Sequence, residues 1–199
     1  MAIAPSLAGR EAALVADVRL GDRLAVVTDP TTRKVLGARV AGALAASAAV
    51  EEIVLDERPH ADMATVEALR ARAGGADALI AVGAGTLNDL CKYAAYLDDK
   101  PYAVFGTAPS MNGYTSVSAA ITQDGHKKSL AARAPLGVFL DLRVLAAAPP
   151  RMIQSGIGDS ICRPTAQADW LLAHLLLDQP YRTAPFELLR DDEARLFAS

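Results

Sequence analysis

A glycine-rich turn joins an apolar run to a segment with helical spacing. It reads Val-Gly-Ala-Gly-Thr-Leu-Asn-Asp over residues 82–89. Small residues let a backbone approach a ligand closely, and the first turn of a helix offers free N–H groups to a pyrophosphate. The turn lacks the third glycine of the GxGxxG fingerprint. Phosphate binding and an ordinary strand-to-helix turn capped by Thr86 therefore both stay open.

A second polar loop follows the next apolar run. It reads Thr-Ala-Pro-Ser-Met-Asn-Gly-Tyr-Thr-Ser over residues 107–116. Ligands of open parallel sheets bind beyond the carboxyl ends of the strands, so we expect both loops to face one crevice. The alternative is a surface loop rich in turn-forming residues. The pairing of two such loops favours a functional role.

Asp159 ends the motif Gly-Ile-Gly-Asp (residues 156–159), which we expect to open a long helix. Its carboxylate either caps that helix or ligates a metal ion. A catalytic zinc-like ion needs further ligands, usually histidines. His60 is expected in solvent and His126 in a hairpin turn, while His174 lies about four helical turns beyond Asp159. Taken alone, the chain does not complete a metal site.

Three further charged residues could meet a ligand. Asp29 follows the first predicted strand and either accepts from a ribose hydroxyl or caps the next helix. Lys127 and Lys128 could approach an anionic substrate, or could form a solvated pair in a hairpin.

The elements that must position these residues alternate between strand and helix. Such alternation is typical of βαβ units on a parallel sheet, whose strands are covered on both faces. Four apolar runs predict strands at residues 23–28, 51–55, 77–82 and 101–105, with helices near 31–46, 62–73 and 86–97.

The pattern changes after residue 115. Asp124-Gly125 predicts a hairpin between 116–123 and 127–131, and one more strand is expected at 137–140. Helical segments follow at 149–154, 159–177 and 185–197. We therefore predict an α/β, Rossmann-like nucleotide-binding domain over residues 1–148, followed by the beginning of an all-helical domain over 149–199.

Composition limits the class of protein. The 199 residues are 52% hydrophobic and 22% charged, which argues against general disorder. A net charge of -3 argues against nucleic-acid binding. No apolar run approaches the roughly 18–20 residues of a membrane span, and Arg10, Glu11 and Asp17 argue against a signal peptide. Cys91 and Cys162 lack metal or redox spacing, so a cytoplasmic location is expected.

Four motifs in order carry a resemblance. Residues 83–93, 107–116, 125–128 and 156–159, followed by Ala-Asp-Trp-Leu-Leu-Ala-His at 168–174, resemble the sn-glycerol-1-phosphate dehydrogenase family. That family belongs to the group of iron-containing alcohol dehydrogenases, glycerol dehydrogenases and dehydroquinate synthases. The resemblance covers the N-terminal part of the family and implies an oxidoreductase of phospholipid metabolism, acting on a small polyol or polyol phosphate.

The resemblance also implies site roles. NAD or NADP would contact Asp29, Gly83, Gly85, Thr86, Asn88, Asp89, Thr107, Ser110 and Ser116. Asp159 would be the catalytic residue and ligate a divalent metal (Zn, Fe or Ni). The expected substrate residues are Asn112, Lys128 and Asp159.

Two departures from the family pattern stand out. Many relatives carry an aspartate where this chain has Asn112, whose amide cannot act as a carboxylate. Family members also continue for about another domain, with two histidines that complete the metal site. The alternatives are a truncated nucleotide-binding remnant without catalysis and a dehydroquinate synthase-like lyase. The amphipathic last helices lead us to expect a homo-oligomer.

Overall fold

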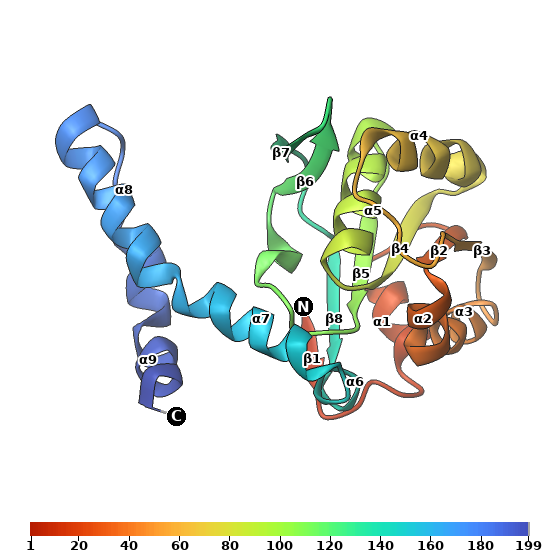
Figure 1. Ribbon diagram of the computed structural model, residues 1–199. Helices are drawn as coiled ribbons and strands as arrows, with labels where there is room; N and C mark the ends of the chain where they lie inside the picture. Colours follow the sequence, from red (N-terminus) through yellow and green to blue (C-terminus); the bar gives the residue numbers. More distant parts are fainter. Residues whose placement is uncertain (199) are drawn as a thin grey trace.

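The computed structural model describes residues 1–198 and contains a six-stranded parallel sheet (Figure 1). The strand order is β1-β8-β5-β4-β2-β3. The strands are β1 (Ala2–Ala4), β2 (Arg23–Thr28), β3 (Ala49–Val54), β4 (Ala78–Gly83), β5 (Tyr102–Gly106) and β8 (Gly137–Asp141). The predicted α/β class is confirmed. The sequence patterns missed β1, because three residues are too few to show a periodicity.

Helices cover both faces of this sheet, which explains the continuous apolar runs. Side chains of α4 (Met63–Arg72) and α5 (Gly85–Leu97) pack on one face, and those of α1 (Glu11–Asp17) and α3 (Ala38–Leu44) pack on the other. Every residue of β4 and β5 is buried. Short helical turns complete this part: α2 (Pro30–Thr32), η1 (Arg33–Gly37), η2 (Ala73–Gly75) and η3 (Gly113–Thr115).

The predicted hairpin is confirmed as β6 (Ser118–Gln123) and β7 (His126–Ala131). Asp124 and Gly125 form its turn at φ of 54° and 75°, the left-handed region that two-residue hairpin turns require. Thr122 N donates to Ala61 O at 2.7 Å, which ties the hairpin to the segment before α4. Ala119 and Ile121 join the core beneath α5.

An ion cluster with two buried carboxylates fastens the first elements to the last strand of the sheet. The guanidinium of Arg39 lies 2.7 Å from Glu11 Oε1 and 2.9 Å from Asp141 Oδ2. Both carboxylates are almost fully buried, at 1% exposure. Asp141 also accepts from Leu7 N (2.9 Å) and caps α6 (Leu142–Ala146) through Arg143 N (3.1 Å). The cluster therefore joins α1, α3 and β8 to the start of α6.

Burial alone would raise the pKa of Asp141, but hydrogen bonds from Leu7 N and Arg39 outweigh it and lower that pKa. A carboxylate whose pKa is lower in the folded state stabilises that state at pH values above its unfolded-state pKa of about 3.9. That contribution is lost as the pH falls through the folded pKa.

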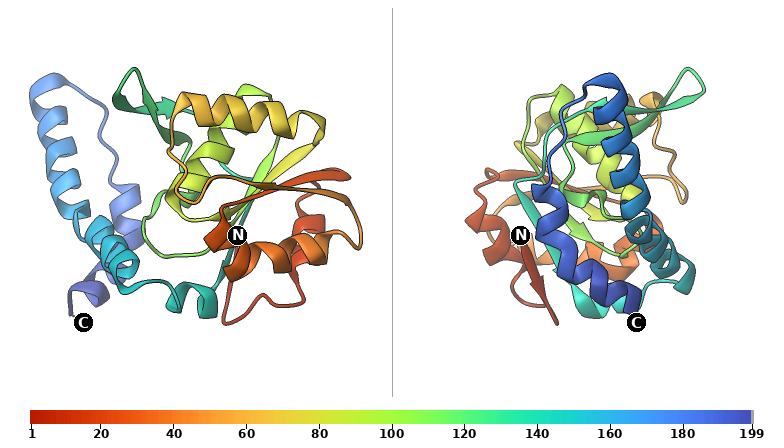
Figure 2. Two further views of the ribbon diagram at one scale, coloured as in Figure 1. Left: turned by 45° about the vertical axis from the view of Figure 1, so that its right-hand side comes forward. Right: turned by 90° about the vertical axis from the view of Figure 1, so that its left-hand side faces the viewer.

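Three helices follow the sheet: α7 (Pro150–Ile161), α8 (Arg163–Leu177) and α9 (Ala184–Ala198). Figure 1 and the left view of Figure 2 show α8 and α9 standing away from the sheet. They pack on one another: the ring centroids of Trp170 and Phe186 lie 5.7 Å apart in an edge-on arrangement, and Arg163 pairs with Glu193 at 2.6 Å. None of the helices within residues 1–198 is long and apolar enough to cross a membrane.

The expectation that Asp159 opens the long helix is wrong. α7 runs without interruption through Gly156 and Gly158, and Asp159 lies in its last turn. Gly156 is small because α7 crosses the loop after β5 there: a Cβ at Gly156 would lie 1.7 Å from Pro109 O. This approach lets Asp159 Oδ2 accept from Asn112 N at 2.7 Å.

Arg39→Met should lower the free energy of unfolding by about 3 kcal/mol, because it leaves two buried carboxylates without their cation. Arg33→Met is the matched control, since Arg33 pairs with the half-exposed Glu52 and its loss should cost under about 1 kcal/mol. Urea titrations above pH 5 measure both. Equal losses in the two variants would contradict a special role for the two buried carboxylates.

Gly156→Ala should separate α7 from the loop after β5, because the new methyl group has no room beside Pro109 O. The Asn112 amide would then exchange faster with deuterium, having lost its carboxylate acceptor. Gly158→Ala is the control: a Cβ at Gly158 meets nothing within 4 Å, and alanine adds about 1 kcal/mol of helix propensity. Unchanged protection of Asn112 in Gly156→Ala would show that this contact does not hold α7.

Candidate functional site

Two clefts open at the carboxyl edge of the sheet. The first, here called the apolar cleft, has a volume of about 600 Å³, and the second, here called the polar cleft, has a volume of about 670 Å³. They share Gly85, Thr86 and Met111. The clefts therefore meet at the N-terminus of α5, which is where a ligand spanning both would pass.

The glycine turn leaves the N-terminus of α5 open. The first backbone hydrogen bond of α5 runs from Asn88 N to Ala84 O at 3.0 Å, so the N–H groups of residues 85–87 have no partner inside the helix. Thr86 does not cap α5 with its side chain, since Ala84 occupies the cap position without a side-chain hydrogen bond. A Cβ at Gly85 would meet only Met111 Cγ at 3.7 Å, so there is space above the turn.

The predicted cofactor residues of this turn divide into three groups. Gly85 and Thr86 line both clefts, and Asp89 lines the polar cleft. Gly83 and Asn88 line neither. Gly83 is small for packing, because a Cβ there would lie 2.3 Å from Leu87 Cδ1. Asn88 is fully buried, and its Nδ2 donates to Asp89 Oδ1 at 3.2 Å.

Asp29 performs the capping role and also faces the apolar cleft. Its Oδ1 accepts from Thr32 N at 2.7 Å, and Thr32 Oγ1 accepts from Asp29 N at 3.0 Å, a reciprocal capping box. Among residues 1–198, Asp29 Oδ2 has no hydrogen-bond partner. One carboxylate oxygen is therefore free to accept from a ligand hydroxyl.

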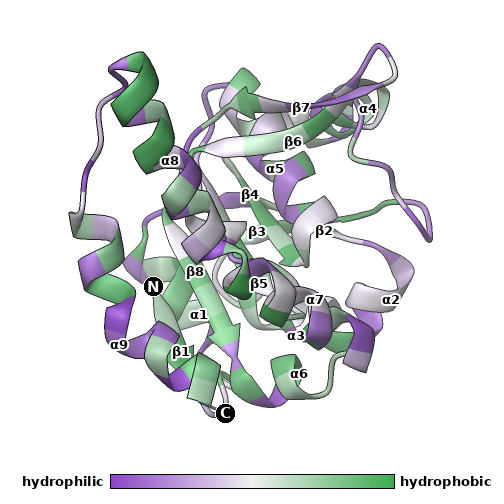
Figure 3. Ribbon diagram, turned by 60° about the vertical axis from the view of Figure 1, so that its left-hand side comes forward, coloured by the Kyte–Doolittle hydropathy of each residue, from purple (hydrophilic) through white to green (hydrophobic). Residues whose placement is uncertain are grey.

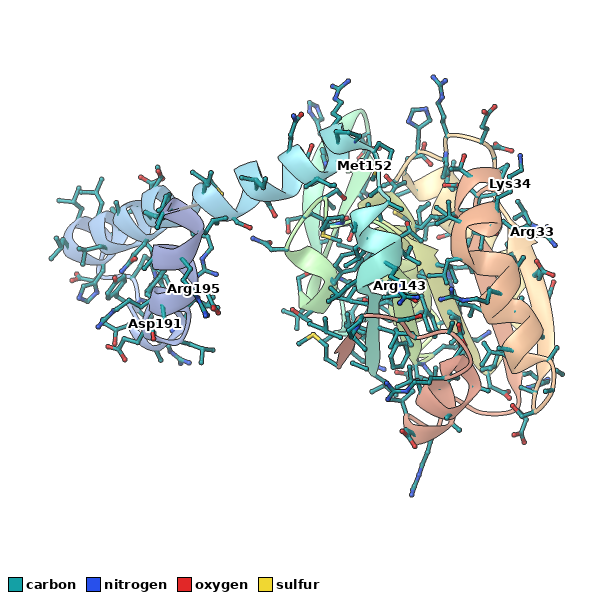
Figure 4. All side chains as sticks on the ribbon, turned by 90° about the horizontal axis from the view of Figure 1, so that it is seen from below. Arg33, Lys34, Arg143, Met152, Asp191 and Arg195 are labelled. Carbon is teal, nitrogen blue, oxygen red and sulfur yellow. The ribbon has the colours of Figure 1, made fainter. Side chains whose placement is uncertain are left out.

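Other walls of the apolar cleft come from segments far apart in the sequence. Arg58 lies after β3, and Met152 lies in the first turn of α7. Figure 4, seen from below, labels Met152 and Arg143 on the neighbouring helices α7 and α6, and Arg33 and Lys34 after β2. The complete lining is Asp29, Thr31, Thr32, Val35, Glu57, Arg58, Pro59, Ala84, Gly85, Thr86, Leu87, Thr107, Ala108, Ser110, Met111, Val144, Ala147, Ala148, Pro149 and Met152.

The loop after β5 separates the two clefts. Thr107 N donates to Gly83 O at 3.1 Å, and Tyr114 Oη donates to Ala108 O at 2.8 Å. These bonds hold the loop against the glycine turn. Thr107 and Ser110 line the apolar cleft, whereas Asn112 and Ser116 line the polar one. All four predicted loop residues therefore border a cleft.

Opposite charges face the polar cleft. Burial raises the pKa of Asp89, while hydrogen bonds from Ala120 N (3.3 Å) and Asn88, together with Lys92 and Lys127, partly oppose that rise. Asp159 and Lys127 complete the charged lining. The polar cleft can therefore present both a cation and carboxylate acceptors to a small polar ligand.

The lysine that borders the polar cleft is Lys127 rather than the predicted Lys128. Lys127 and Ser129 share one side of β7, because side chains alternate along a strand. Lys128 lies on the other side, where its Nζ is 3.8 Å from Asp124 Oδ2. Both lysines were candidates from the sequence, but side chains alternate along the strand, so only one of the two neighbours can line the cleft.

Sequence reasoning missed Lys92, whose side chain is fully buried in α5. Its Nζ donates to Gly113 O (3.1 Å), Ser116 Oγ (2.7 Å) and Ser118 O (3.1 Å). Burial lowers the pKa of Lys92, and the nearby Asp89 opposes that change. The signal was a lysine on a helix face that otherwise carries Cys91, Ala94 and Ala95.

No group of three or more histidine, cysteine, aspartate or glutamate side chains within residues 1–198 could hold a metal ion. Asp159 is well placed in the polar cleft but lacks further ligands there. His174 has local contacts instead: its Nδ1 forms a hydrogen bond with Gln179 O at 2.7 Å, and its ring stacks on Tyr181.

Comparisons with known proteins find similar sequences among named dehydrogenases. The chain is 35% identical over 174 residues to glycerol-1-phosphate dehydrogenase [NAD(P)+] of Bacillus licheniformis, a match covering 85% of this chain and 43% of the relative. It is 38% identical over 167 residues to the protein of that name from Methanothrix thermoacetophila, covering 83% and 47%. The chain thus spans less than half the length of these relatives.

Solved structures share the fold at low sequence identity. Glycerol dehydrogenase from Schizosaccharomyces pombe superimposes with a TM-score of 0.67 at 24% identity, covering 78% of this chain and 40% of that one. Maleylacetate reductase from Rhizobium sp. gives 0.70 at 19% identity, covering 83% and 47%. The model of the family described as iron-containing alcohol dehydrogenase matches residues 2–149, which is more than half of the sequence. The chain belongs to the iron-containing alcohol dehydrogenase family.

Proposed function

We propose that this chain supplies the nucleotide-binding part of an NAD(P)-dependent dehydrogenase that interconverts glycerol 1-phosphate and dihydroxyacetone phosphate, or a related small polyol. The observation that carries the proposal is the meeting of two clefts at the open N-terminus of α5. A dinucleotide has two arms joined by a pyrophosphate. The names of the relatives from Bacillus and Methanothrix support the choice of cofactor and substrate.

The dinucleotide is proposed to lie across both clefts. Its pyrophosphate accepts from the free N–H groups at Gly85 and Thr86, where the helix dipole also favours negative charge. The adenosine arm occupies the apolar cleft, with a ribose hydroxyl donating to the free oxygen of Asp29. Thr107 and Ser110 border that arm, and Asp89 and Ser116 border the nicotinamide arm.

The polar cleft is proposed to hold the substrate beside the nicotinamide. Lys127 offers an ammonium to a phosphate group, and the side chains of Asn112 and Asp159 offer acceptors to polyol hydroxyls. Bound nicotinamide supplies the hydride acceptor. The chain supplies position and charge, and α7 closes one side of the cleft through the Asp159–Asn112 hydrogen bond.

The metal implied by the family name does not fit the described residues as a complete site. A catalytic divalent ion generally takes three protein ligands, and residues 1–198 contain no such group. We propose Asp159 as the single ligand this chain contributes to a Zn, Fe or Ni site.

The two alternative functions have different standing. Relatives at 35% and 38% identity are named dehydrogenases, which favours hydride transfer over a dehydroquinate synthase-like reaction. The fold is shared with 2-deoxy-scyllo-inosose synthase at a TM-score of 0.67 and 18% identity, a likeness of fold only. A nucleotide-binding remnant without catalysis is the other alternative, and it shares with the main proposal the expectation that the isolated chain is inactive.

A cytoplasmic location and a homo-oligomer stay predictions. Apolar side chains on α8, among them Leu175, Leu176 and Leu177, are more than half exposed. Figure 3 shows these hydrophobic turns at the end of α8 distant from the sheet.

Asp29→Asn should weaken ADP binding about tenfold, because the amide keeps the cap but loses the charged acceptor for the ribose. Titration calorimetry with ADP measures the change. Asp62→Asn is the matched control: Asp62 caps α4 through Thr65 N at 2.8 Å in the same way and borders neither cleft. Equal affinity in wild type and Asp29→Asn would remove Asp29 from the binding site.

The chain alone should show no metal-dependent oxidation of glycerol 1-phosphate, because one carboxylate is too weak to hold a catalytic ion. NADH formation with Zn²⁺, Fe²⁺ or Ni²⁺ provides the assay, with a full-length relative as the positive control. Turnover above the metal-free background would show that residues 1–199 complete the site by themselves.

A further inference from the structure

The buried ammonium of Lys92 has all its donors committed to one segment. An ammonium carries three N–H groups. These donate to Gly113 O, Ser116 Oγ and Ser118 O, at 2.7 to 3.1 Å. The side chain is fully buried, so its charge is compensated by these acceptors and by Asp89 rather than by water.

The same turn of α5 holds the far end of that segment. Asp89, three residues before Lys92 and on the same side of the helix, accepts from Ala120 N at 3.3 Å. Residues 113–120 are therefore fastened to α5 at both ends. Gly113, Ser116, Ser118 and Ala120 all border the polar cleft, and none of them borders the apolar cleft.

The bonds of Lys92 also fix what Ser116 can offer a ligand. Ser116 Oγ accepts from Lys92 and donates its own hydrogen to Ser118 O at 2.8 Å. A hydroxyl has one hydrogen and two lone pairs, so a single lone pair is left. A ligand in the polar cleft therefore meets Ser116 as an acceptor, which suits an N–H or O–H group and not a phosphate oxygen.

We propose that Lys92 is a positioning residue that shapes the polar cleft for the nicotinamide arm, by fastening residues 113–118 and setting Ser116 as an acceptor. The proposal rests on the proposed dinucleotide function. It separates the two arms of the ligand, because the lysine acts on the wall of one cleft only. Loss of Lys92 should weaken the binding of NADH, which is proposed to occupy both clefts. It should leave the binding of ADP, which occupies the apolar cleft alone, unchanged.

The test compares Kd for ADP and for NADH in wild type and in Lys92→Met. We expect NADH to bind at least about tenfold more weakly in the variant while the Kd for ADP stays the same. Lys100→Met is the matched control, since Lys100 also donates to carbonyls, of Ala73 (2.8 Å) and Gly74 (3.0 Å), but borders neither cleft. It should leave both affinities unchanged.

If Lys92→Met weakens the binding of NADH and ADP by the same factor, or weakens neither, the proposed role of Lys92 is overturned. Absence of ADP binding to the wild-type chain instead contradicts the proposed function. If Lys92→Met does not fold, NMR on the wild-type chain decides: the Lys92 ammonium signal should shift at saturating NADH and keep its position at saturating ADP. A signal that NADH leaves in place overturns the proposal.

Discussion

The parallel pairing of β4 with β5 is the constraint on which the rest of the site depends. Its register sets Gly83 beside Gly106, so that the glycine turn and the polar loop leave the sheet side by side. A Cβ at Gly106 would lie 2.6 Å from Leu140 Cδ2, so the residue at this position of β5 must lack a side chain. Shifting this register would part the two loops and remove the junction between the clefts.

The main features of the fold could be predicted from the sequence because they depend on local pattern. Buried parallel strands give continuous apolar runs, and Asp124-Gly125 defines its own turn. Asp29 could be placed at the carboxyl end of a strand, but the sequence did not reveal that it both caps the next helix through one carboxylate oxygen and lines the apolar cleft. β1 was missed because its three residues form a strand only by pairing with the distant β8.

Site features that depend on distant contacts were less predictable. The choice between Lys127 and Lys128 depends on which side of β7 faces the cleft, and the sequence leaves that register open. Gly83 was predicted to contact the cofactor, but position 83 needs a glycine because the side chain of Leu87 packs against it. Gly156 and Gly158 suggested a break before a helix, yet α7 continues through both, because the first glycine allows contact with Pro109. Lys92 bonds to residues more than 20 positions away.

The order of strands also bears on how the chain reaches this state. β1 is the first strand in the sequence, yet its partner β8 begins at Gly137, so their pairing closes a loop of most of the α/β part. Contacts between distant residues carry a large entropic cost and form late unless other structure has already brought them together. During synthesis β2, β3, β4 and β5 can pair before β8 emerges. β1 is thus made before β8 but can pair only after it, and the ion cluster of Arg39 is complete only once Asp141 is in place.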